Sequence, residues 1–266
     1  FYFKTDANNE NKQEVSIKRE MPLRVTHIGP ILPDLLGVTI EERKVEYGRQ
    51  AIYQAHKDDR FIEDGTDIWV VRKGKPIGSL VGRTEKYLMP FDKVFGDRLD
   101  TISVEKTSSY IISSTDDADL NNGSAPYMVY RKTKPSDMAR IGTTFDAPLT
   151  HIIYIKLLKP MKPGKHYKID FKQLNIPQQE FLYEPKKTRS EAVHVSHIGF
   201  RPDDPVKVAF LSLWMGSGGP LDFREKTPFY LIDEKNDEFA FKGEVRLSKK
   251  LTEKNENAYG NNFNGT

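Results

Sequence analysis

The stretch HIIYIKLLKPMKPGKHYKIDF, residues 151–171, decides which fold class this sequence predicts. Its first part, residues 151–157, is rich in β-branched and aromatic side chains, which suit the pleated surface of a sheet. Residues 159–165 contain two prolines and a glycine, which are typical of a turn. Apolar and polar side chains then alternate with a period of two in residues 167–171. This strand-turn-strand unit is typical of antiparallel β-sandwiches.

Further strand signals occur along the chain. Residues 68–71 and 76–81 are apolar strands on either side of a polar turn, and residues 110–114 and 127–130 flank a polar loop. Helical periodicity is scarce, and residues 41–56, the best helical candidate, have sparse apolar positions. We therefore expect an all-β fold of two tandem antiparallel β-sandwich (Ig-like) modules, the second of them incomplete.

A boundary is expected near residues 184–190, where the chain becomes polar and charged. The pentapeptide VTHIG at residues 25–29 returns as VSHIG at residues 195–199, so each copy would open a module. The expected division is a polar lead-in (1–19), a first β-sandwich module (20–187) and a second module (190–266).

Composition restricts the class of protein. The net charge of +3 is the difference between 41 basic and 38 acidic residues among 266, and the two signs are interspersed, so no nucleic-acid partner is expected. No apolar run approaches the roughly 20 residues of a membrane span. Cysteine is absent, which excludes thiol catalysis, Cys-ligated zinc and disulfides. The chain begins without Met, as it would after removal of a secretory signal or at a cloning boundary. We expect a secreted, periplasmic or cell-surface protein.

Residues 194–212, HVSHIGFRPDDPVKVAFLS, concentrate ionisable side chains in a short segment. His194 and His197 are three apart on an expected strand, so they point to opposite faces and do not converge. The arginine and the two aspartates of the loop at 200–205 are expected to bond locally, and residues 206–211 to form a mostly buried strand. The segment is therefore interpreted as scaffold.

The same segment resembles a known domain. Residues 190–205, followed by KVAFLS at 207–212, resemble the opening of the Ig-like domain that precedes the catalytic barrel in glycoside hydrolase family 9. That domain has a Val-x-Gln-x-Gly-Tyr-x-Pro segment and then a Lys-x-Ala-x-Leu-Ser strand; here His197 replaces the Gln and Phe200 replaces the Tyr. Residues 229–234 and 241–245 resemble its next hairpin and strand. The resemblance covers residues 190–266.

The resemblance implies a role in bracing a catalytic barrel. It implies two partners: the chain's own missing C-terminal catalytic domain, and a polysaccharide. An Ig-like sandwich needs about 100 residues, more than the second module has, so its last strands are missing or come from elsewhere. The family's Asp-Ala-Gly-Asp motif and helical barrel are absent, so no catalytic residue is carried over. Nucleophile-elbow, zinc-protease and phosphate-loop motifs are absent too.

One loop has the spacing of a calcium site. Asp117, Asp119 and Asn121 place oxygen side chains at alternate positions, as calcium loops do. Gly123 comes one position late, and Met128 stands where an EF-hand has a bidentate Glu. An ordinary Asx-rich turn explains the same residues. Apart from calcium, no cofactor is expected.

Exposed aromatic side chains would offer a platform for sugars, because a pyranose ring stacks on an aromatic face. Trp69, Trp214 and Tyr127 are the candidates, and the alternative for each is a place in the core. Three functions remain: a non-catalytic accessory region of a secreted polysaccharide-degrading glycoside hydrolase, a structural or adhesive surface protein that binds another protein, and an enzyme whose site lies in the first module.

Overall fold

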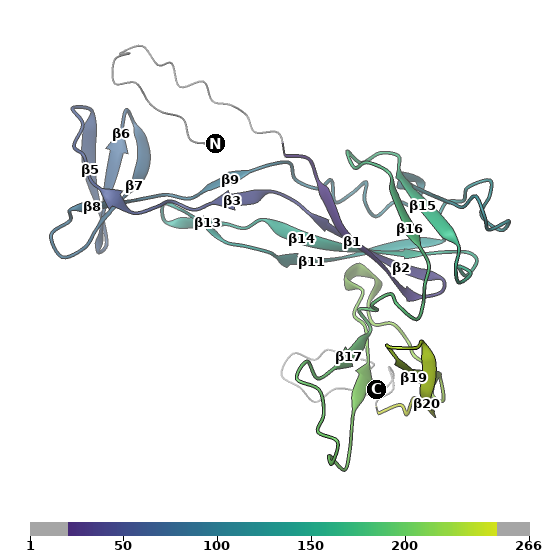
Figure 1. Ribbon diagram of the computed structural model, residues 1–266. Coiled ribbons are helices and arrows are strands. Elements are labelled where there is room, and N and C mark those ends of the chain that lie inside the picture. The colour runs from purple at the N-terminus through teal and green to yellow at the C-terminus, as the bar shows by residue number, and fades with distance from the viewer. Residues whose placement is uncertain (1–20, 249–266) are drawn as a thin grey trace.

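The computed structural model describes residues 21–248, so the predicted lead-in at residues 1–19 and the end of the second module lie outside the described residues. The described chain is all-β, and its antiparallel sheets are joined by loops and two short 3-10 turns, at Thr107–Ser109 and Gly216–Gly218 (Figure 1). The predicted all-β class with antiparallel sheets is confirmed, while the Ig-like arrangement of the modules stays a prediction.

The first module packs a four-stranded sheet against a three-stranded sheet. The larger sheet has the order β1-β2-β14-β11, with bounds Arg24–Leu32, Leu35–Glu41, Leu149–Lys156 and Met128–Pro135. The smaller sheet has the order β10-β15-β16, with bounds Tyr110–Ser113, His166–Phe171 and Gln179–Leu182. Inward-facing side chains from both sheets form one buried cluster, which is the main core.

The stretch at residues 151–171 contributes one strand to each sheet. Ile153 and Ile155 of β14 lie in the core together with Tyr167 and Ile169 of β15, and all four are buried. The period of two places these alternate residues on the inner face of each strand. Both predicted strands are confirmed, and the turn at 159–165 carries the chain from one sheet to the other.

A long arm extends from the sandwich. We define it as residues 44–95 and 139–146. Two ribbons, β3–β9 (Lys44–Glu46 and Lys93–Phe95) and β12–β13 (Ala139–Ile141 and Thr144–Asp146), lead to a five-stranded sheet at the end farthest from β15 and β16 (Figure 1). That sheet has the order β4-β8-β7-β6-β5, with bounds Ala51–Ile52, Tyr87–Pro90, Lys75–Val81, Asp67–Arg72 and Asp59–Asp64.

The helical candidate at residues 41–56 is wrong, because this segment supplies β3 and β4. Its backbone is extended and lies close to the backbone at Pro90. A Cβ atom at Gly48 would come 1.9 Å from the carbonyl oxygen of Pro90, so only glycine fits this close approach. The few apolar residues of this segment are therefore explained by a two-stranded ribbon that has little core of its own.

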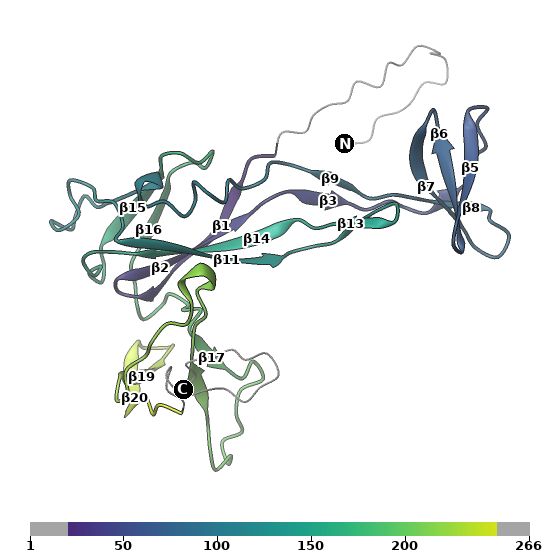
Figure 2. The same ribbon diagram turned by 180° about the vertical axis from the view of Figure 1, so that it is seen from behind.

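The described part of the second module, residues 190–248, contains two hairpins below the larger sheet. The first pairs β17 (Val193–Val195) with β18 (Ala209–Leu211), and the second pairs β19 (Pro228–Asp233) with β20 (Glu238–Glu244) (Figure 2). The repeated pentapeptide does not repeat in structure: residues 25–29 lie within β1, whereas residues 196–199 form a turn closed by a hydrogen bond from the Gly199 N–H to the Ser196 carbonyl.

The strand predicted for residues 206–211 is wrong in both length and burial. Only Ala209–Leu211 are paired as β18, and Val206, Val208 and Phe210 are exposed. The apolar pattern is present, but in this segment only Leu211 packs against a buried cluster.

Candidate functional site

The described part of the second module exposes many large apolar side chains. In β19 the consecutive residues Phe229, Tyr230 and Leu231 are all exposed, so both faces of the hairpin carry apolar side chains that reach solvent. In β20, Phe239 and Phe241 are 59% and 54% exposed. Isolated two-stranded hairpins are marginally stable in water, and contiguous exposed apolar surface marks an interaction site.

The other hairpin is equally uncovered. Val193 and Val195 lie on one face of β17, and Phe210 of β18 is paired with His194, whose side chain points to the other face. All of these side chains are exposed. We call the exposed apolar side chains of β17, β18, β19 and β20 the open faces of the second module.

One side of the second module is closed by a seam with the first. The seam is a cluster of buried side chains from both modules: Leu35, Tyr154, Ala192, Leu213, Met215 and Phe223. Leu35 and Tyr154 belong to the outer face of the four-stranded sheet, opposite to the core face. The second module is therefore seated on the first through a small apolar core.

A glycine-rich loop locks this seam to strand β11. A Cβ atom at Gly216 would come 2.1 Å from the carbonyl oxygen of Arg131, and the φ of Gly216 is +64°, so two constraints require glycine there. The Arg131 backbone N–H donates to the Ser217 hydroxyl at 3.0 Å. The Ser217 hydroxyl thus satisfies a backbone group of β11.

Charged groups complete the seam. The carboxylate of Glu191 accepts a hydrogen bond from the Tyr154 hydroxyl at 3.0 Å and pairs with the Lys132 ammonium group at 2.7 Å. Burial, followed by the charge of Glu191, raises the pKa of Tyr154 well above its usual value. The phenol therefore stays protonated and keeps donating.

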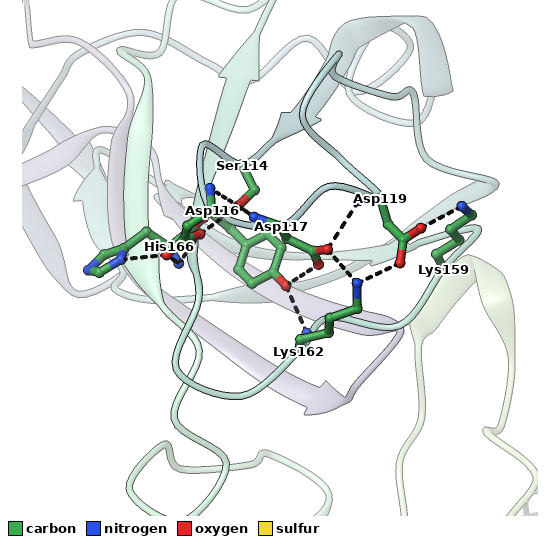
Figure 3. A network of polar contacts seen from close by, with 8 residues as sticks. Ser114, Asp116, Asp117, Asp119, Lys159, Lys162 and His166 are labelled. Atoms are coloured by element: carbon green, nitrogen blue, oxygen red, sulfur yellow. Dashed lines mark hydrogen bonds and ion pairs between the residues drawn. The ribbon is translucent and has the colours of Figure 1, made fainter.

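The loop with the calcium-like spacing is held by lysines (Figure 3). The Lys162 ammonium group lies 2.7 Å from a carboxylate oxygen of Asp117 and 2.7 Å from one of Asp119. Lys159 binds the other oxygen of Asp119 at 2.8 Å. The side chain of Asp117 is fully buried and also accepts a hydrogen bond from the Tyr167 hydroxyl at 2.7 Å.

These contacts stabilise the charged carboxylates. The hydrogen bonds from Lys159 and Lys162 lower the pKa of Asp119 to about 2, and the bond from Lys162 lowers the pKa of Asp117. Asn121 is exposed. A calcium ion between Asp117 and Asp119 would have to displace the Lys162 ammonium group, which already neutralises both carboxylates. Whether calcium binds here stays a prediction. Isothermal titration of chelator-treated protein with calcium tests this prediction. If the heat released does not exceed the heat of dilution, the calcium site is excluded.

The three aromatic candidates lie in different environments. Trp69 of β6 is half-buried and packs edge-on against Phe91, with ring centroids 5.4 Å apart, and its outer edge contacts Gly142 of the β12–β13 ribbon. Tyr127 is 60% exposed and Trp214 is 41% exposed. Trp69 thus joins the two parts of the arm, while Tyr127 and Trp214 keep accessible ring surface. Binding of sugar to any of them stays a prediction.

The ionisable side chains of residues 194–204 do not form a joint site. Arg201 pairs with Asp203 through two contacts, at 3.1 and 2.9 Å, and the Arg201 N–H donates to Asp204 at 2.7 Å. These are the local bonds that the sequence predicts. His194 contacts the backbone carbonyl of Ser212 at 3.1 Å, a bond between neighbouring strands of its own module.

A row of three polar side chains lies at the arm end of the first core, in which His151 and Glu42 are buried and Thr133 is exposed. The Thr133 hydroxyl lies 2.9 Å from Nδ1 of His151, and Nε2 of His151 lies 3.4 Å from a carboxylate oxygen of Glu42 without hydrogen-bond geometry. Burial lowers the pKa of His151. The imidazole is completely buried, so no substrate atom can reach it. We interpret the row as structural, since Glu42 also accepts the Leu99 N–H at 2.8 Å.

Residues 21–248 contain neither a cluster of metal ligands nor a membrane-spanning helix. No group of three or more His, Cys, Asp or Glu side chains in this range is arranged to hold a metal ion. No helix there has the length and hydropathy that crossing a membrane requires.

No protein-family model, no curated protein and no solved structure matches the chain.

Sequence reasoning missed the lysines at Asp117 and Asp119. Lys162 is 45 residues from Asp117 along the chain, and it was interpreted only as part of a turn. The available signal was charge: Lys159, Lys162 and Lys165 concentrate positive charge in one turn, and the loop at 116–119 concentrates negative charge. The seam glycine Gly216 had no comparable signal.

Proposed function

We propose that this chain is a non-catalytic accessory region of a secreted polysaccharide-degrading glycoside hydrolase, in which two β-sandwich modules brace the catalytic barrel. The observation that carries the proposal is the seam. The second module is fixed to the four-stranded sheet by buried apolar side chains and by the loop at Gly216, while its other sides stay open. A module that is fixed on one side and exposes apolar side chains on its other sides is suited to pack against a further domain.

The resemblance of residues 190–266 to the domain that precedes family 9 barrels supports the proposal that this further domain is a catalytic barrel. Hydrolysis would then depend on paired carboxylates of the barrel, about 6.5–9.5 Å apart in inverting enzymes. The exposed ring surfaces of Tyr127 and Trp214 support a contact with glycan.

The coding sequence beyond residue 266 tests the proposal most directly. A reading frame that continues into a helical barrel with paired carboxylates supports it, and a stop codon directly after Thr266 overturns it. In the longer protein, deleting residues 190–248 should lower the melting temperature of the barrel while leaving its carboxylates intact. An unchanged melting temperature would contradict the bracing role.

Glycan contact needs a separate measurement on the chain itself. Retention on insoluble cellulose and xylan should fall when Trp214 is replaced by Ala, and release of reducing sugar should be absent. The matched control is Phe210→Ala, which removes an exposed aromatic ring of the same module that was not assigned to sugar binding. Equal retention of Trp214→Ala and the parent chain would contradict the stacking role.

The open faces also favour a second candidate, a structural or adhesive surface protein whose modules bind another protein. Its prediction differs from the first: the chain ends without a catalytic domain, and the exposed apolar side chains of β17–β20 contact a separate protein.

A further inference from the structure

The arm is joined to the sandwich by short connecting segments (Figure 1). Within residues 21–248 the chain crosses between the two parts at four places, which we call the neck: residues 42–43, 96–99, 136–138 and 147–148. The Glu42 N–H donates to the Leu149 carbonyl at 3.1 Å, and the Glu42 carboxylate accepts the Leu99 N–H at 2.8 Å. The Ser136 N–H donates to the Pro148 carbonyl at 2.9 Å. These bonds hold the segments of the neck together.

Arg43 adds ionic contacts to the neck. Its guanidinium group pairs with the Asp146 carboxylate at 2.7 and 3.0 Å and donates to the Ala147 carbonyl at 2.7 Å. Its Nε lies 3.6 Å from a carboxylate oxygen of Glu42 and has no hydrogen-bond partner among residues 21–248. The side chains of Arg43 and Glu42 are only 8% and 3% exposed. A new charge in the neck would therefore act on its neighbours with little screening by water.

Hydrogen bonds determine the tautomer of His151, which lies in β14 beside the neck. The Arg131 guanidinium group donates to the Thr133 hydroxyl at 2.5 Å, so the hydroxyl hydrogen can donate to Nδ1 of His151, 2.9 Å away. The neutral imidazole therefore accepts at Nδ1 and carries its hydrogen on Nε2. Nε2 lies 3.4 Å from a carboxylate oxygen of Glu42 and has no hydrogen-bond partner in the described part of the chain.

A second proton on His151 is disfavoured while the neck is closed. The imidazole is completely buried, and Nδ1 would have to donate to the Thr133 oxygen, which already accepts from Arg131. Charged groups face His151 from the neighbouring elements. Glu42, after β2, favours the proton, Arg131 of β11 opposes it, and Glu105, between β9 and β10, pairs with Arg131 at 2.9 Å. Burial outweighs the effect of Glu42 and lowers the pKa of His151.

We propose that the neck is an acid-sensitive latch, in which uptake of a proton by His151 opens the contacts of Glu42 and frees the arm to move relative to the sandwich. An open neck admits water to the imidazole, so the open state takes up the proton near the ordinary His value of about 6.5. Above that pH, His151 is neutral in both states and the neck stays closed. As the pH falls below it, the open state binds the proton first, and the closed state loses stability relative to it. The latch uses only contacts of the first module and the arm, so it is independent of the proposed function.

Hydrogen exchange of single backbone amides in the whole chain tests the latch. The reporters are the N–H groups of Glu42, Leu99 and Ser136, which form the bonds of the neck. After correction for the intrinsic exchange rate, lowering the pH from about 7.5 to about 5.5 should reduce their protection several-fold, with about tenfold as the limit for one proton. The Ile112 N–H, which donates to the Ser124 carbonyl at 2.9 Å within the sandwich, should keep its protection.

His151→Gln keeps a polar side chain but cannot take up the proton, so the amides of the neck should lose their pH dependence. The matched control is His194→Gln, which removes an exposed histidine of the second module and should respond to pH like the parent chain. If His151→Gln fails to fold, NMR titration of the parent chain decides, and the pKa of His151 should lie below its ordinary value.

Four results would each overturn the latch. The first is a pKa of His151 at or above its ordinary value in the parent chain. The second is protection of the neck amides that does not change with pH, and the third is an equal loss at Ile112, which would indicate unfolding of the whole module. The fourth is a folded His151→Gln variant that keeps the full pH response of the parent chain.

Discussion

The first and second modules use similar apolar residues with opposite results. In the first module, two sheets face each other and the alternate residues of β2, β14, β10 and β15 are buried between them. In the second, two hairpins carry Val, Leu, Phe and Tyr side chains that remain largely in contact with solvent. Apolar alternation therefore establishes that a segment forms a strand, but a buried face requires a second sheet to cover it.

The largest expected effect contrasts two isoleucines. Ile153→Ala removes a completely buried side chain from the first core and should lower the free energy of unfolding by about 2–5 kcal/mol. Ile198→Ala changes a residue that is 97% exposed in the second module and should cost less than about 0.5 kcal/mol. Urea denaturation followed by circular dichroism measures both. Comparable losses in the two variants would contradict the contrast between the modules.

The seam allows a sharper test of how the two modules are joined. Gly216→Ala should loosen the second module, because the added Cβ overlaps the Arg131 carbonyl at 2.1 Å. Gly199→Ala is the matched control: its φ of +75° imposes a comparable left-handed cost of about 1–2 kcal/mol, but nothing lies within 4 Å. Limited trypsin digestion should cut after Lys186 and Lys187 several-fold faster in the first variant only. Identical digestion patterns would argue against a rigid seam.

The smallest expected effect concerns acid stability of the first module. The pKa of Asp119 is lowered to about 2 by Lys159 and then Lys162, and the pKa of Asp117 is lowered by Lys162. An unfolded Asp titrates near 3.9, so the unfolded chain binds these protons first and the stabilisation is lost as the pH falls from about 4 toward 2.

Replacing Lys162 by Met should move this acid transition upward by about half to one pH unit, because Asp117 then lacks its main cationic partner. Urea midpoints measured between pH 7 and pH 2 report the shift. Lys235→Met, in the exposed turn of the β19–β20 hairpin, is the control and should behave like the parent chain. A transition at the same pH in both variants would refute the role of the lysine.

Local patterns predicted the strands well. The residues of the stretch 151–171 became β14 and β15, and those at 68–81 became β6 and β7. Alternation and turn residues act over a few positions, so they are visible in a single sequence. The same argument explains the correct prediction of the local bonds between Arg201 and its two neighbouring aspartates.

Contacts between residues far apart in the sequence could not be predicted from local sequence patterns. Nothing near Gly216 indicates that the loop meets Arg131, 85 positions earlier, because the close approach depends on how two modules dock. The burial predicted for residues 206–211 failed for the related reason that a strand's pattern does not contain the element that should cover it. Both errors concern the arrangement of sheets and not the identity of strands.

The β12–β13 ribbon has a mechanical consequence. Its two strands continue the chain from β11 and return it to β14, so the backbone of the ribbon runs directly into two strands of the four-stranded sheet (Figure 2). Contact between Trp69 and Gly142 joins the tip of the arm to this ribbon. A pull on the far end would pass through this contact into the ribbon and then along covalent bonds into β11 and β14, the strands on which the second module rests, and would load them in shear.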